Sequence, residues 1–180
     1  ISGVLGSLLP AYLFCVAELG IDGALAGTLN SLTPIFVIIT GALFFSSKTS
    51  ANKILGICIA FTGSILLLLS KGHMHESQNL VYVSFIVLAT ICYGINVNMV
   101  HKFLPEIGSL QIAALALTLN AIPALIILIF TGYFSLPLTD PGILYSTGHA
   151  AILGIFGTAI ASILFYILIK RAGAVFSSMV

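Results

Sequence analysis

The stretch GTAIASILF at residues 157–165 decides the fold, because it repeats an earlier part of the chain, GSLLPAYLF at residues 6–14. After a slip of one residue the similarity resumes, with GAVFSS at residues 173–178 matching GALAGT at residues 23–28. Five hydrophobic spans separate the two copies, so the copies point in opposite directions through a bilayer. Inverted repeats of this kind are typical of secondary transporters, which bind substrate near the membrane midplane between the halves.

The composition excludes a soluble domain. Hydrophobic residues make up 59% of the chain and charged residues 6%, whereas about a quarter of the residues in a soluble domain are charged. The chain could not solvate its own surface in water, so we expect the lipid bilayer as its surroundings. The net charge is +1 and no basic stripe is present. We therefore expect no nucleic-acid partner.

Six apolar stretches approach or reach the roughly 20 residues that a helix needs to cross the hydrocarbon of a bilayer. None of them contains Asp, Glu, Lys, Arg or His. Because such long runs do not alternate between apolar and polar residues, they are typical of helices rather than barrel strands. The sequence therefore predicts an all-α fold, a polytopic transmembrane helix bundle, with spans at residues 2–17, 24–45, 54–70, 80–100, 110–133 and 150–169.

Small residues recur at every fourth position on three of these spans. This spacing lets membrane helices approach closely. We expect helix–helix contacts, which would also act as pivots between the halves, at the triplets Gly23, Gly27 and Ser31; Gly56, Ala60 and Ser64; and Gly154, Thr158 and Ser162.

The distribution of Lys and Arg predicts the orientation. The alternate connections that we expect on one side carry five of the six basic residues, namely Lys48, Lys53, Lys102, Lys170 and Arg171. The opposite side carries only Lys71, together with the acidic residues Glu18, Asp22, Glu76 and Asp140. Because positive charge favours the cytoplasmic side, we expect the connection at 46–53, Lys102 and Lys170 in the cytoplasm. The predicted location is the inner (plasma) membrane, crossed several times.

Several segments resemble one family of membrane proteins. These are LNSLTPIF at residues 29–36, Lys48, GICIAFTGSILL at residues 56–67, LGIFGT at residues 153–158 and KRAGA at residues 170–174. They resemble the EamA family of the drug/metabolite transporter superfamily. The resemblance covers nearly the whole chain and implies a transporter of ten helices arranged as two inverted repeats of five.

The resemblance also implies a division of the chain. By register, it looks like helices three to eight and the start of helix nine, so we expect the natural protein to be longer at both ends. Residues 1–71 would end the first repeat, residues 72–78 would form an external connection, and residues 79–180 would begin the second repeat. The family's Glu–Arg pair after its fourth helix is replaced here by Ser47 and Lys48, so that charge pair cannot form in the usual way.

Polar residues inside the spans are the candidates for a substrate site. Tyr93 and Asn96 are three apart on one helical face and offer an aromatic ring and an amide. Asn30 and Thr33 share a face beside Pro34, which removes a backbone donor and frees a carbonyl that can face a cavity. The resemblance also implies that the helix carrying Asn30 lies against the central cavity. Further candidates are Tyr12 and Asn120 at mid-span, and Ser162 with Tyr166.

Each candidate also has a structural interpretation. A polar side chain in a membrane helix often only hydrogen-bonds a neighbouring helix, and Pro123 is expected to kink its helix. Two histidines in the segment HMHE at residues 73–76 form a weak ligand set, so we predict no metal site and no cofactor. His101 and His149 are expected at helix ends, in interfacial positions. The three cysteines lie singly in different spans and are expected to pack.

The predicted function is transport of a small organic metabolite, resembling an amino acid or a drug, by alternating access and in the export direction. No span contains a carboxylate, which favours a facilitator or exchanger. A non-transport scaffold or assembly protein is the alternative. An intramembrane enzyme is less favoured, because no nucleophile–base pair, paired carboxylates or metal set occurs in the spans. The protein is therefore predicted not to be an enzyme. The sequence leaves open whether the protein forms a homodimer.

Overall fold

The computed structural model describes residues 1–47, 50–70 and 80–179, and every regular element in these ranges is a helix. The prediction of an all-α polytopic bundle is therefore confirmed. In chain order the elements are η1 (Val4–Leu8), α1 (Leu9–Ala17), α2 (Gly23–Asn30), α3 (Thr33–Phe45), α4 (Ala51–Ser70), α5 (Leu80–Phe103), α6 (Ser109–Phe130), η3 (Tyr133–Ser135), α7 (Pro141–Ile152), η4 (Leu153–Ile160), α8 (Ala161–Ala172) and α9 (Ala174–Ser177).

Four helical stretches are long and apolar enough to cross a membrane: Gly23–Phe45, Leu80–Phe103, Ser109–Phe130 and Pro141–Ala172. Two shorter apolar helices, Val4–Ala17 and Ala51–Gly63, correspond to the first and third predicted spans. All six predicted spans are thus helical, which is the structure of a multi-pass membrane protein.

The second predicted span, residues 24–45, is wrong in one respect, because it is interrupted at Ser31 and Leu32. Pro34 has no N–H to donate to the carbonyl of Asn30, so an α-helix cannot run through this point with its hydrogen bonds intact. A new helix, α3, begins at Thr33 with Pro34 in its first turn, where proline is well tolerated. The Ser31 hydroxyl donates to the carbonyl of Thr28 at 2.6 Å, at the end of α2.

The sixth predicted span, residues 150–169, is also wrong at its start, because the helix begins at Pro141. Asp140 is the N-cap residue, and its side chain accepts from the backbone N–H of Gly142 at 2.8 Å. Asp followed by Pro is a sequence signal for a helix start. The polar residues that follow lower the local hydropathy, so a hydropathy criterion does not detect this part of the helix. His149 lies in the last turn of α7, where the helical run continues through η4 to Ala172.

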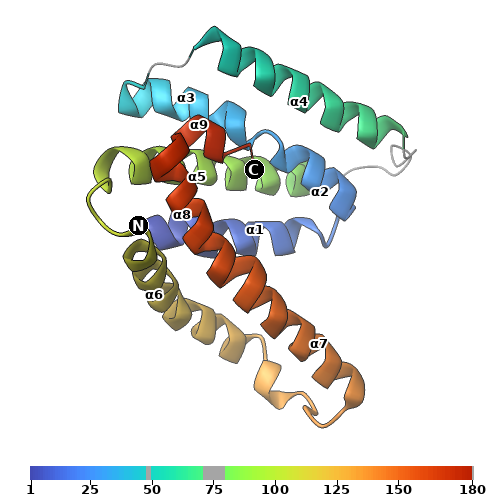
Figure 1. The fold of residues 1–180 in the computed structure, drawn as a ribbon. Coiled ribbons are helices and arrows are strands. Elements are labelled where there is room, and N and C mark those ends of the chain that lie inside the picture. Colours follow the sequence, from blue (N-terminus) through green and yellow to red (C-terminus); the bar gives the residue numbers. More distant parts are fainter. Residues whose placement is uncertain (48–49, 71–79, 180) are drawn as a thin grey trace.

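Helix α5 lies at the centre of the bundle, between α1 and α3 (Figure 1). Helices α3 and α5 approach closely at Gly94, where an added Cβ atom would lie 2.9 Å from the carbonyl oxygen of Phe36. Helix α6 packs against α8, and the far part of this pair projects with α7 away from α5. The two ends of the bundle are distinguished by Lys102, whose Nζ donates to the carbonyl of Phe45 at 2.9 Å. We call this the Lys102 end.

The glycines of the predicted small-residue triplets do not make the expected helix contacts. An added Cβ atom at Gly23, Gly27, Gly56 or Gly154 would meet nothing within 4 Å. The spacing alone predicts which residues share a helix face, but not what that face meets. Close approaches occur instead at other glycines, Gly6 and Gly94 among them.

Some predictions concern residues outside those that the structure describes. These are Lys48, Lys71, the connection at 72–78 and the histidine-containing segment at 73–76.

Candidate functional site

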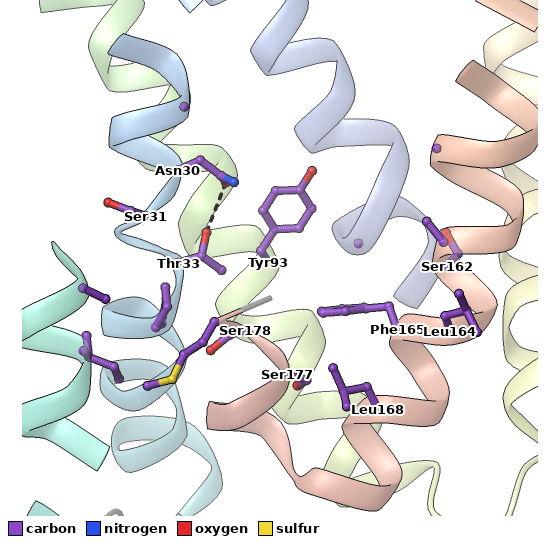
Figure 2. A pocket seen from close by; sticks show the side chains of 18 residues that line it. Asn30, Ser31, Thr33, Tyr93, Ser162, Leu164, Phe165, Leu168, Ser177 and Ser178 are labelled. Carbon is purple, nitrogen blue, oxygen red and sulfur yellow. Dashed lines mark hydrogen bonds between the residues drawn. The ribbon is translucent and has the colours of Figure 1, made fainter. Parts of the chain in front are cut away.

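A cavity of about 940 Å³ lies between α2 and α3 on one side and α8 on the other (Figure 2). Among the residues that the structure describes, no charged side chain lines it. The lining residues are Gly6, Gly27, Asn30, Ser31, Thr33, Pro34, Ile57, Ala60, Tyr93, Gly157, Ala161, Ser162, Leu164, Phe165, Leu168, Ser177, Ser178 and Met179.

One wall of the cavity is polar. It contains Asn30, Ser31 and Thr33 from the interrupted span and Tyr93 from α5. Thr33 Oγ1 donates to Asn30 Oδ1 at 3.3 Å, so the Asn30 amide nitrogen can donate to a bound molecule. Figure 2 shows this amide on the same side as the Tyr93 ring. The break before Pro34 also leaves the Asn30 carbonyl without its helical donor. This wall therefore combines amide and hydroxyl groups with an aromatic ring.

The opposite wall, from α8, is mainly apolar. Leu164, Phe165 and Leu168 line it, together with the hydroxyl of Ser162. Ser177 and Ser178 of α9 add polar groups at one end of the cavity. Mostly apolar lining with a few placed polar groups is typical of sites for small organic molecules, and the volume is within the range of about 300–1,000 Å³ for such sites.

The two copies of the sequence repeat contribute matching positions to this cavity. Gly6 and Gly157 occupy the same position in the first matched segment, and Gly27 and Ser177 in the second. All four line the cavity. The single cavity is therefore built from equivalent parts of both copies, an arrangement expected for a site between inverted halves.

Exposure along the lining residues falls towards the Lys102 end. Gly27 and Asn30 are exposed, whereas Thr33 and Pro34, further along the same span, are buried. Gly157, at the far end of the α8 wall, is exposed. Along the α2–α3 wall, the end away from Lys102 is therefore the more exposed one.

The structure brings together four of the seven predicted site residues, namely Asn30, Thr33, Pro34 and Tyr93. Asn96 is 2% exposed and accepts a hydrogen bond from Ser2 Oγ at 2.7 Å, and it does not line the cavity. Asn120 Nδ2 donates to the carbonyl of Gly3 at 2.7 Å and joins α6 to the start of the chain.

Tyr12, the seventh predicted residue, is 53% exposed and lies elsewhere. It lines a separate apolar groove of about 420 Å³ between α1 and α6, together with Phe130 and Thr131. Tyr12 therefore lies apart from the other predicted site residues.

Sequence reasoning missed Phe165, Ser177 and Ser178 as lining residues. The repeat contained the signal for all three. Ser177 and Ser178 match Gly27 and Thr28, at the end of the segment that leads to Asn30, and Phe165 matches Phe14. The Phe14 ring lies 6.5 Å from the Tyr93 ring, between centroids.

A contact that adjoins the cavity, which we call the α3–α5 seam, is formed against α3 by the buried residues Gly94 and Asn98 and by the exposed Lys102. Asn98 Nδ2 donates to the carbonyl of Val37 at 2.7 Å and to that of Gly94 at 2.9 Å, and it lies 3.1 Å from Thr40 Oγ1. The Lys102 ammonium lies 5.9 Å and 5.8 Å from the ring centroids of Phe45 and Phe103. The polar groups of the seam are thus used to hold two helices together.

The fold and the cavity define a class of protein: a multi-pass α-helical membrane protein with an uncharged cavity between helices. Comparison with known proteins identifies the family. The family model described as the EamA-like transporter family matches residues 80–180, which is more than half of the chain. The chain belongs to this EamA-like transporter family.

A curated relative, an uncharacterized transporter of Archaeoglobus fulgidus, is 24% identical over 121 residues. The match covers 67% of this chain and 42% of that protein, so the chain spans less than half of the relative's length. No solved structure matches the chain. The resemblance inferred from the sequence is confirmed by the family match.

Proposed function

We propose that the protein transports a small, net-neutral organic solute across the inner (plasma) membrane by alternating access, in the export direction. The observation that carries this proposal is the cavity between matching positions of the two sequence copies. Membership of a transporter family supports transport. Lys and Arg are more frequent in the connections expected on one side, which supports placing that side in the cytoplasm. Export is movement of the solute away from that side.

The cavity chemistry supports an amphiphilic solute. A fixed charge on the solute would need an opposite charge in the site to offset its desolvation, and none of the described residues that line the cavity is charged. A polar or zwitterionic group would bind at Asn30 and the serine and threonine hydroxyls. An apolar group would pack against Phe165 and Leu168. Neutral amino acids and related amphiphiles have this combination.

The test is solute counterflow in proteoliposomes that contain the full-length protein, with a panel of labelled neutral amino acids and small amphiphiles. We expect at least one solute to exchange faster than in protein-free liposomes. For that solute, Asn30→Ala should lower the exchange rate by about two- to tenfold, the value of one neutral hydrogen bond. The matched control is Asn52→Ala, at an exposed position of α4, which should exchange at the unsubstituted rate.

Three results would contradict the proposal. If no solute in the panel or in a cell extract exchanged, a scaffold or assembly role would be the better function. If Asn30→Ala and Asn52→Ala lowered the exchange rate equally, the loss could not be assigned to the cavity. Consumption of a solute without its movement across the bilayer would favour the intramembrane enzyme.

A further inference from the structure

Three polar side chains from three helical segments meet beside the cavity, two of them buried and the third, Ser2, partly exposed. Ser2 Oγ donates to Asn96 Oδ1 at 2.7 Å and lies 3.2 Å from Tyr166 Oη. Because the Ser2 hydroxyl has one proton and gives it to an amide oxygen, the Tyr166 hydroxyl must donate to Ser2. Asn96 is 2% exposed and Tyr166 5%. The cluster therefore joins the start of the chain, α5 and α8 through two partly buried hydrogen bonds.

Each member of the cluster lies about one helical turn from a residue that lines the cavity. Ser2 is four residues before Gly6, Asn96 is three after Tyr93, and Tyr166 is four after Ser162. Helix α1 starts at the Lys102 end, and α5 and α8 finish there. In all three cases the cluster residue therefore lies nearer the Lys102 end than the corresponding lining residue does.

Beyond this cluster, the bundle is closed by apolar packing. Val97 and Val100 of α5, Val37 of α3, Ile169 of α8 and Val175 of α9 belong to one buried hydrophobic cluster. Tyr166 belongs to it as well. The Ser2–Asn96–Tyr166 cluster thus lies at the boundary between the cavity and the closed end.

The connections across this boundary differ in strength. Helix α3 is held to α5 by two hydrogen-bond contacts of Asn98, to the Val37 carbonyl and to Thr40 Oγ1. The segment η1, which leads into α1, is held to α5 by close packing of Gly6 against the Asn96 amide. In residues 1–47, 50–70 and 80–179, by contrast, the Tyr166 hydroxyl makes the only side-chain hydrogen bond of α8. Apolar contacts can separate without leaving unsatisfied polar groups, so α8 is the helix that can leave this junction most easily.

We propose that the Ser2–Asn96–Tyr166 cluster is the gate that closes the cavity at the Lys102 end, and that it opens by breaking the Ser2–Tyr166 hydrogen bond as α8 moves away from α5. The inference rests on the proposed transport function. When this bond breaks, Ser2 keeps its bond to Asn96, and the Tyr166 hydroxyl is exposed to the water that enters. The solute passes between α8 and the unit formed by α1, α3 and α5.

The test measures opening directly and needs no solute. In the full-length protein in lipid nanodiscs, with the native cysteines replaced by alanine, spin labels are placed at Phe44→Cys on α3 and Arg171→Cys at the end of α8. Both native side chains are exposed. Tyr166→Phe should raise the ratio of long to short label distances about fivefold, the effect of one hydrogen bond. Tyr133→Phe is the matched control, because the Tyr133 hydroxyl contacts Thr147 Oγ1 at 2.8 Å, away from the gate.

A double-substitution cycle separates a gate from a general loosening of the protein. Ser2→Ala should shift the same distance population, and adding Tyr166→Phe to it should produce less than the sum of the two effects, since both remove one contact. An unchanged distribution in Tyr166→Phe would overturn the proposal, as would an equal shift in Tyr133→Phe. If the gate variants shift the distances but no solute is transported, the gate stands and the transport function falls.

Discussion

Asn30 and Asn98 are both asparagines in apolar helices, but they lie in regions of opposite character. Asn98 uses its amide nitrogen inside the α3–α5 seam, on two carbonyls and a hydroxyl. Asn30 receives a hydrogen bond from Thr33 and turns its amide towards the cavity. The difference shows that a polar residue in a span holds helices together where its partners are backbone groups of another helix. A polar residue can bind a solute where, like Asn30 among the described residues, it is hydrogen-bonded to a neighbour on its own segment.

The largest effect is expected from a matched pair of glycines, one in each region. In Gly94→Val the new side chain would collide with the backbone of Phe36 and Val37, so we expect a loss of about 3 kcal/mol in stability, at the upper end of overpacking costs. The readout is the amount of monodisperse protein after heating in detergent. Gly27→Val should remain stable, because an added Cβ meets nothing within 4 Å, but should lower solute exchange by filling the cavity. Equal stability of the two variants would contradict the comparison.

Asn98→Ala removes the polar contacts of the seam. We expect it to lower stability by about 1–2 kcal/mol, because hydrogen bonds between membrane helices contribute modestly and the unfolded state finds other partners. The melting temperature in detergent measures this effect, with Asn30→Ala as the comparison that should melt near the unsubstituted protein. A variant that melts normally yet loses exchange would place Asn98 in the transport site instead.

Asn96→Ala tests whether Asn96 belongs to the cavity or to the contacts that hold helices together. The sequence favoured Asn96 as a substrate ligand, for which exchange should fall at unchanged abundance in the membrane. The buried contact with Ser2 instead leads us to expect a loss of about 1 kcal/mol in stability together with a change in exchange rate. Abundance by quantitative blotting, measured beside exchange, tests this. Reduced exchange at full abundance and unchanged melting would favour direct substrate contact.

The smallest effect is expected at the end of the seam. Lys102→Met keeps most of the apolar stem but removes the hydrogen bond to the Phe45 carbonyl and the contacts with two aromatic rings. Both contacts are at an exposed site, where such interactions are weak. We expect the melting temperature to fall by about 1–3 °C and solute exchange to stay unchanged. A larger fall, or one that disappears at high salt, would mean that charge matters more here than packing.

The sequence predicted the helical class, the six spans and the family, because hydropathy and the repeat are properties of the chain itself. It predicted the lining of the cavity only in part. The residues around Pro34 were found, since proline has a local effect on the helix, and Tyr93 was found by its depth in a span. Asn96 and Asn120 could not be separated from the lining residues, because their partners, Ser2 and Gly3, lie 94 and 117 residues away in the sequence.

The long helical run from Pro141 to Ala172 has a consequence for the membrane that surrounds the protein. Its 32 residues rise about 48 Å at about 1.5 Å per residue, whereas the hydrocarbon of a bilayer is about 30 Å thick. Such a mismatch is accommodated by tilting, and the tilt depends on bilayer thickness. Since the same run carries the apolar wall of the cavity, the acyl-chain length of the lipids becomes a control on cavity shape. Exchange rates should therefore be compared only between vesicles of equal thickness.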